Sequence, residues 1–142
     1  MGIMKNKVER HLKSHKKHGK PVLFLLIDSE NFKTSKDVEK MAKGLVKACK
    51  KMTAAPAILV GGSSATDQIE MNNVVKIIKK ITRLDTILFP GNITGVVPKA
   101  DAILFSSLMN SENPYYITQA QALGAPLVRK FNLEALPTAY LV

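Results

Sequence analysis

Residues 22–27 read VLFLLI and are followed directly by Asp28. The run is wholly apolar and rich in branched side chains, and it lacks the alternation that marks a half-exposed strand. It therefore predicts a β-strand covered on both faces, which is typical of a parallel sheet with helices outside it.

Outward from this strand, apolar runs alternate with amphipathic helices. Apolar side chains at helical spacing, with lysines opposite, predict a helix over residues 33–52, and a further helix begins at Asp67. A third helix is predicted over residues 114–123. The other predicted strands are residues 57–60, 86–89, 102–105, 126–128 and 138–142. Residues 90–101 make a tight connection with little room for a crossover helix.

Two architectures fit this alternation, an open doubly wound sheet and a (β/α)8 barrel. The G-x-G-x-x-G fingerprint is absent after the first strand, where Asp28 stands, which argues against the commonest dinucleotide-binding open sheet. A complete barrel needs about 200–250 residues, whereas the chain has 142. We therefore predict one α/β domain over residues 1–142, an incomplete TIM barrel with about six of the eight strands.

Residues 1–20 are predicted to form a basic leading helix, before βα units over residues 21–142. They hold seven Lys or Arg against one Glu, and so supply +6 of the net charge of +10. This balance favours anionic partners, but nucleic-acid binding is disfavoured because no aromatic residues are interleaved with the lysines. His11, His15 and His18 could share one side of this helix. We expect a solvated face and no metal site there, because lysines repel a cation and no carboxylate assists.

The sequence predicts a cytoplasmic protein with no transmembrane segment. No apolar run approaches the roughly 18 residues that a membrane span needs. The basic N-terminus lacks the small-residue cleavage site of a signal peptide.

Candidate site residues follow the first two strands. Asp28 ends the first, and Gly61, Gly62, Ser63 and Ser64 end the second. The carboxyl ends of parallel strands share one rim, where glycines let backbone N–H groups approach an anion. A carboxylate with a serine hydroxyl is a plausible partial ligand set for Mg²⁺. Two other readings stay open: the glycines form only a tight turn, and Asp28 only caps a loop.

Four segments together resemble the geranylgeranylglyceryl phosphate synthase family, and their order and spacing fit throughout. They are IDSENF (27–32), ILVGGSSATDQIE (58–70), ILFPGNITGVVPKADAILFSSLMNSENPYYITQAQALGAP (87–126) and LPTAYLV (136–142). The resemblance runs from about residue 21 to the last residue. The bacterial heptaprenylglyceryl phosphate synthases are related and share much of this set.

The resemblance implies a Mg²⁺-dependent prenyltransferase on a modified TIM barrel. Such enzymes join geranylgeranyl diphosphate to the 3-hydroxyl of sn-glycerol 1-phosphate, release pyrophosphate, and make the first ether bond of archaeal-type membrane lipids. The family's shortened third connection agrees with residues 90–101. Carried over by position, the metal ligands are Asp28 and Ser63. Substrate contacts are expected at Gly61, Gly62, Ser64 and Tyr140.

The resemblance also implies an apolar groove for the prenyl chain, with Tyr115 or Tyr116 at its far end, and a tendency to form oligomers. Ser29 and Glu30 replace the family's usual proline and acid after the aspartate. The family's catalytic glutamate, in a Val-Glu-Pro-Gly stretch, lies beyond residue 142. We therefore expect this chain alone to be inactive or nearly so. The alternatives are a non-catalytic half-barrel that needs a second chain, or a basic nucleic-acid-binding protein.

Overall fold

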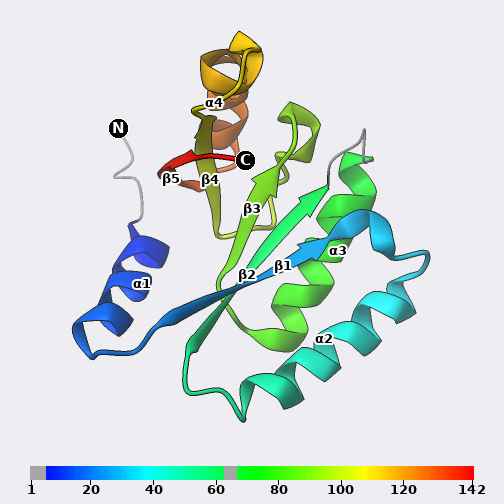
Figure 1. Ribbon diagram of the computed structural model, residues 1–142. Helices are drawn as coiled ribbons and strands as arrows, with labels where there is room; N and C mark the ends of the chain where they lie inside the picture. Colours follow the sequence, from blue (N-terminus) through cyan, green and yellow to red (C-terminus); the bar gives the residue numbers. More distant parts are fainter. Residues whose placement is uncertain (1–5, 63–66) are drawn as a thin grey trace.

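The computed structural model describes residues 6–62 and 67–142, and its centre is a parallel five-stranded sheet (Figure 1). The strands are β1 (Val22–Asp28), β2 (Ala55–Gly62), β3 (Thr86–Pro90), β4 (Ala102–Leu108) and β5 (Glu134–Tyr140). The α-helices are α1 (Lys7–Lys17), α2 (Ser35–Cys49), α3 (Gln68–Thr82) and α4 (Ala120–Lys130). Shorter turns are η1 (Ser29–Asn31), η2 (Ile93–Gly95) and η3 (Tyr115–Gln119).

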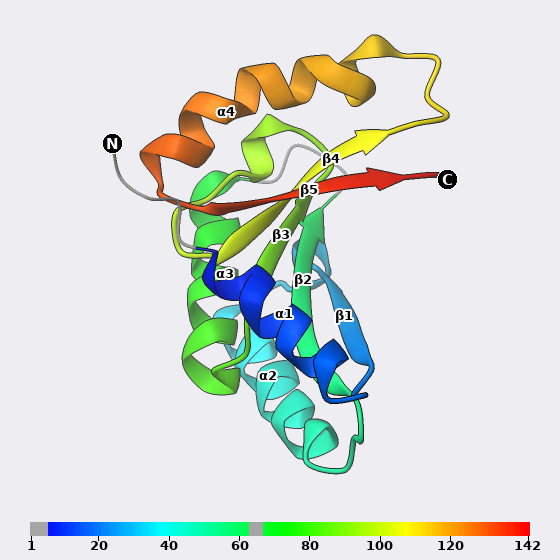
Figure 2. The same cartoon turned by 90° about the vertical axis from the view of Figure 1, so that its left-hand side faces the viewer.

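The strand order decides between the two predicted architectures. It is β1-β2-β3-β4-β5, with every neighbouring pair parallel. A doubly wound sheet reverses its order at a switch point, whereas a barrel adds each strand beside the previous one. Residues of α2, α3 and α4 share one buried cluster with the strands, so these helices cover the same face of the sheet. The chain therefore forms an arc of a barrel with its helices outside (Figures 1 and 2).

The predicted helices α2 and α3 are confirmed, and each begins at a polar cap. Thr34 and Asp37 form a reciprocal capping box at the start of α2. The Asp67 carboxylate accepts a hydrogen bond of 2.7 Å from the backbone N–H of Ile69 at the start of α3. These caps satisfy N–H groups that have no partner inside the helix.

The tight connection between β3 and β4 is confirmed as well. It contains the 3₁₀ turn η2 in place of an α-helix, and its Val96 and Val97 are buried in the core. Gly95 permits this path, because a Cβ atom there would lie 2.6 Å from Cβ of Pro90. The chain therefore passes too close to Pro90 for a residue with a Cβ atom to take the place of Gly95.

The predicted strand over residues 126–128 is wrong, because these residues belong to α4. Gly124 and Val128 are buried, one helical turn apart, while Pro126 is exposed. Pro126 has no N–H group to donate to the carbonyl of Ala122. Both residues are exposed, so water can reach this carbonyl. The π-helical turn η3 precedes α4. The final strand is Glu134–Tyr140 rather than residues 138–142, so the described part of the chain has five strands, not six.

The predicted leading helix is observed as α1, and it lies against the inner face of the sheet. Val8 is 1% exposed and packs in a second buried cluster with Ala57, Ile87, Ala102 and Leu136. These residues alternate along their strands with those that face α2 and α3, so they point to the barrel interior. The helix therefore fills the interior near the ends where the strands begin.

Candidate active site at the carboxyl ends of the strands

Two predicted site residues, Asp28 and Gly61, lie in one row across the sheet with Phe89 of β3. Asp28 is the register partner of Gly61, and Gly61 is the partner of Phe89. Successive side chains of a strand point to opposite faces, and Gly61 lies four residues from the inward-facing Ala57. The row therefore faces the barrel interior.

Four of the six predicted site residues line one hollow of about 240 Å³ at this rim. They are Asp28, Gly61, Gly62 and Tyr140. Tyr140 lies edge-on to Phe89, with 5.5 Å between the ring centroids, so the two rings form an aromatic wall of the hollow. The other two predicted residues, Ser63 and Ser64, lie outside the described residues.

Gly61 owes its place to the close approach of β3. A Cβ atom at this position would lie 2.9 Å from the backbone oxygen of Phe89. The carbonyl of Gly61 accepts a hydrogen bond of 3.0 Å from the buried hydroxyl of Ser29. Ser29 thus ties the end of β1 to β2.

Asp28 both caps a turn and contributes a carboxylate to the hollow. Its Oδ1 accepts a hydrogen bond of 3.0 Å from the backbone N–H of Glu30 and so closes η1. The predicted capping role is therefore confirmed, but it occupies only one oxygen.

Oδ2 of Asp28 has no donor among the described residues and is of the hard-oxygen type that Mg²⁺ prefers. Over residues 6–62 and 67–142, no three His, Cys, Asp or Glu side chains converge to enclose a metal ion. One carboxylate oxygen supplies a single ligand of the kind that Mg²⁺ takes, so the other ligands of such an ion would be oxygens of water and substrate.

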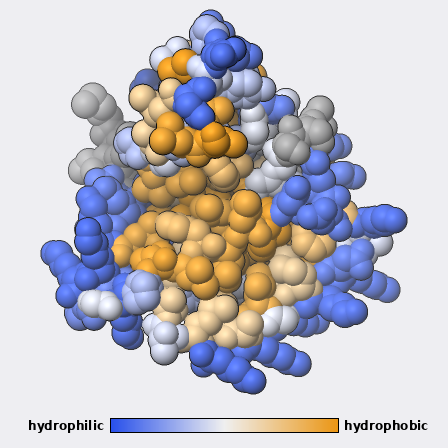
Figure 3. All heavy atoms as spheres, viewed as in Figure 1, coloured by the Kyte–Doolittle hydropathy of each residue, from blue (hydrophilic) through white to orange (hydrophobic). Residues whose placement is uncertain are grey.

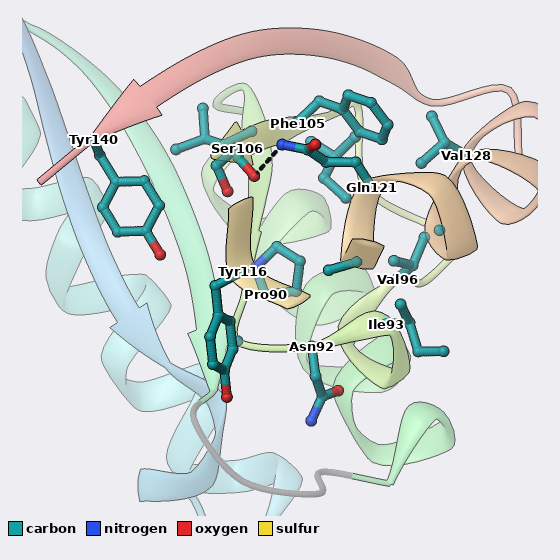
Figure 4. Close-up of a pocket in the computed structure, with 15 residues that line it drawn as sticks. Pro90, Asn92, Ile93, Val96, Phe105, Ser106, Tyr116, Gln121, Val128 and Tyr140 are labelled. Atoms are coloured by element: carbon teal, nitrogen blue, oxygen red, sulfur yellow. Dashed lines mark hydrogen bonds between the residues drawn. The ribbon is translucent and has the colours of Figure 1, made fainter. Parts of the chain in front are cut away.

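A smaller apolar cavity of about 60 Å³ adjoins the hollow, beneath η3 and α4 (Figure 4). The two spaces share Pro90, Gly91 and Tyr140. In Figure 4, Tyr140 and Tyr116 lie at one side of the cavity and Val128 at the other. Its side chains are mainly apolar, so it suits a hydrocarbon better than a charged group.

Tyr116, rather than Tyr115, lines this cavity. Tyr115 instead packs edge-on against Tyr116, with 5.1 Å between the ring centroids. Gln121 fixes the helical side of this cavity, because its Nε2 donates a hydrogen bond of 2.6 Å to the Ser106 carbonyl (Figure 4). The same nitrogen donates a hydrogen bond of 2.6 Å to the Ser107 hydroxyl.

Sequence reasoning missed three residues of this region, namely Phe89, Gln121 and Gly124. Phe89 could have been found, because it ends a predicted strand at the same rim as Asp28. Gln121 and Gly124 had no such signal, since their role depends on how α4 crosses β4.

The part of the chain that the structure describes contains no helix long and apolar enough to cross a membrane.

The fold and the rim define a protein of the (β/α)-barrel class, with its candidate site where barrel enzymes carry theirs. The PcrB family matches residues 14–142, and the chain belongs to this family. The geranylgeranylglyceryl phosphate synthase of Nitrosopumilus maritimus is 64% identical over 96% of the chain and 52% of that protein. The synthase of Cenarchaeum symbiosum is 62% identical over 95% of the chain and 52% of that protein.

Solved structures agree with the sequence matches. The (S)-3-O-geranylgeranylglyceryl phosphate synthase of Thermoplasma acidophilum, in complex with its substrate sn-glycerol-1-phosphate, superposes with a TM-score of 0.80 at 32% identity. That match covers 94% of this chain and 51% of the Thermoplasma chain. The chain therefore spans about half the length of the relatives it matches.

Proposed function

We propose that this chain supplies the metal-binding half of a geranylgeranylglyceryl phosphate synthase active site. The observation that carries the proposal is the convergence of Asp28, Gly61, Gly62 and Tyr140 on one hollow, in a chain 64% identical to such a synthase. The substrates proposed are geranylgeranyl diphosphate and sn-glycerol 1-phosphate.

In the proposed reaction, the 3-hydroxyl oxygen of glycerol 1-phosphate bonds to the allylic carbon of the prenyl diphosphate. The bond from that carbon to the diphosphate oxygen breaks, pyrophosphate leaves with the electron pair, and the hydroxyl proton passes to a base. Bound Mg²⁺, held by Asp28 and Ser63, would neutralise charge on this leaving group. The backbone N–H groups of Gly61 and Gly62 would approach the diphosphate. The catalytic glutamate, according to the family resemblance, lies beyond residue 142.

The prenyl chain is proposed to run from this hollow into the apolar cavity beneath α4. The shared residues Pro90, Gly91 and Tyr140 support a continuous path between the two spaces. Tyr116 would then contact the hydrocarbon, and Gly124 would leave room for it beneath the helix.

We further propose that activity requires strands beyond β5. Apolar side chains gather over the middle of the face drawn in Figure 3. On β1, Phe24 is 44% exposed and Leu26 is 63% exposed. Within the described sheet, β1 and β5 each have a neighbour on one side only. Further parallel strands would pair these edges and cover the apolar interior.

The test completes the barrel by co-expressing the chain with the remaining half of the Nitrosopumilus maritimus synthase. Transfer of labelled glycerol 1-phosphate into a prenyl ether is measured with Mg²⁺ present. We expect ether formation by the pair and little or none by the chain alone. Asp28→Asn should lower the rate of the pair at least about 100-fold, because a removed metal ligand weakens transition-state charge stabilisation. Glu39→Gln, which alters an exposed carboxylate on α2, is the matched control.

An inactive pair that is correctly folded would contradict the proposed function. An Asp28→Asn pair as active as the unmodified pair would contradict only the metal-binding role of Asp28. Full activity of the chain alone would contradict the need for further strands.

A further inference from the structure

The second group of converging polar side chains lies at the opposite end of the strands, on α1. His11 and His15 are four residues apart, and their Nε2 atoms lie 3.1 Å from each other. The two ring centroids are 4.7 Å apart. The two rings therefore approach each other through the edges that carry the Nε2 atoms. Two imidazole nitrogens on one helical face are therefore already side by side.

Asp85, which directly precedes β3, orients the first of these rings. Its carboxylate contacts Nδ1 of His11. An ionised carboxylate only accepts hydrogen bonds, so Nδ1 of His11 is the donor in this contact, and in the neutral tautomer with the proton on Nδ1 the lone pair lies on Nε2. The sequence offered no carboxylate for these histidines, because Asp85 is 74 residues away along the chain.

The spacing of the two nitrogens matches the bite of one transition-metal ion. Zinc–imidazole bonds of about 2.0–2.1 Å, meeting at tetrahedral or right angles, place the two nitrogens about 2.8–3.4 Å apart. The observed 3.1 Å, which is a hydrogen-bonded contact between the two rings, lies within this range. His11 is 54% exposed, which leaves room for water ligands in the remaining positions.

We propose that His11 and His15 bind a Zn²⁺-type cation, with Asp85 as the positioning residue for His11. The carboxylate–histidine pair is the arrangement that commonly orients metal-bound imidazoles and raises their basicity. Binding would need neutral His15 only to move its proton from Nε2 to Nδ1. Two nitrogen ligands favour zinc over magnesium, which takes oxygen ligands. The ion would link two successive turns of α1, and its effect would reach the start of β3 through the contact between His11 and Asp85. The site is independent of the proposed catalytic function.

The experiment titrates zinc chloride into the full chain by calorimetry, with excess Mg²⁺ present to occupy oxygen sites. We expect one saturable zinc ion per chain and a higher midpoint of thermal unfolding with zinc. His15→Gln should weaken zinc binding at least about tenfold, and Asp85→Asn by about 10–100-fold. His18→Gln is the matched control, because Nδ1 of His18 contacts the Ser14 carbonyl and lies outside the pair.

Circular dichroism of His15→Gln checks that α1 remains helical, so that a loss of binding reports the ligand and not the fold. The proposal is overturned if zinc does not saturate, or if His15→Gln binds zinc as tightly as the unmodified chain. Equal losses in His15→Gln and His18→Gln would also overturn it. Unchanged affinity in Asp85→Asn would overturn the positioning role of Asp85.

Discussion

The carboxylate of Glu134 accepts a hydrogen bond of 2.8 Å from the backbone N–H of Val8, 126 residues earlier in the chain. Its other oxygen accepts one of 2.8 Å from the N–H of Glu9. Glu134 begins β5 and is 5% exposed. A buried carboxylate thus caps the first turn of α1, where the helix dipole also favours negative charge. The last described strand holds the leading helix beneath the sheet.

Replacing Glu134 by Gln should lower the free energy of unfolding by about 1–3 kcal/mol. The amide keeps one acceptor oxygen, but its NH₂ group faces a backbone N–H that then has no acceptor. Urea unfolding followed by circular dichroism measures the change. Glu39→Gln on the exposed face of α2 should change stability by less than about 0.5 kcal/mol. Equal effects of the two substitutions would contradict the capping role.

Two glycines should respond to alanine with opposite signs. Gly61→Ala places a methyl group 2.9 Å from the Phe89 backbone oxygen and should cost about 1–3 kcal/mol of stability. Gly44 lies exposed within α2, and an added Cβ meets no atom within 4 Å. Gly44→Ala should therefore raise stability by about 0.5–1 kcal/mol, because alanine loses less entropy in a helix. Denaturant midpoints of the two variants test this, and a stable Gly61→Ala protein would argue against the close packing of β2 on β3.

The exposed interior of the sheet should bind an apolar dye. Leu26→Ser removes a side chain that is 63% exposed on the inner face and should reduce the fluorescence of bound anilinonaphthalene sulfonate. Leu123→Ser is the control, because Leu123 is 57% exposed but lies on α4. Leu123→Ser should leave most of the dye fluorescence, since an isolated exposed leucine makes no continuous apolar patch. The same loss in both variants would show that the inner face is not the dye-binding surface.

Filling the cavity beneath α4 should affect only the prenyl substrate. In the completed barrel, Gly124→Leu projects a side chain into this cavity and should raise KM for geranylgeranyl diphosphate several-fold. KM for glycerol 1-phosphate should stay unchanged. Ala125→Leu adds the same side chain one residue further on, at an exposed position, and serves as the control. An unchanged KM in Gly124→Leu would exclude the cavity from the prenyl path.

Much of the rim could be predicted from sequence. Asp28, Gly61 and Gly62 follow apolar runs of a parallel sheet, and the carboxyl ends of such strands meet at one edge whatever the details of packing. Tyr140 was predicted from the family resemblance, and the structure places it in the same hollow. The roles of these residues, and the magnesium ion they are proposed to bind, stay predictions.

The errors arose where local composition and tertiary context disagree. Residues 126–128 read as a strand because a proline precedes two apolar residues, yet α4 continues through them with Pro126 turned to solvent. Choosing between Tyr115 and Tyr116 required the position of η3 above β4.

By itself, then, the sequence determined the parallel strands, the flanking helices and the rim on which Asp28 and the glycines meet. These features depend on hydrophobic periods and on strand direction, which are local properties of the chain. Only the tertiary structure decided that the strands follow one another without reversal, that Glu134 caps α1, and that Asp85 orients His11. Each of these contacts joins residues far apart in sequence, and their geometry depends on how the whole sheet curves and packs.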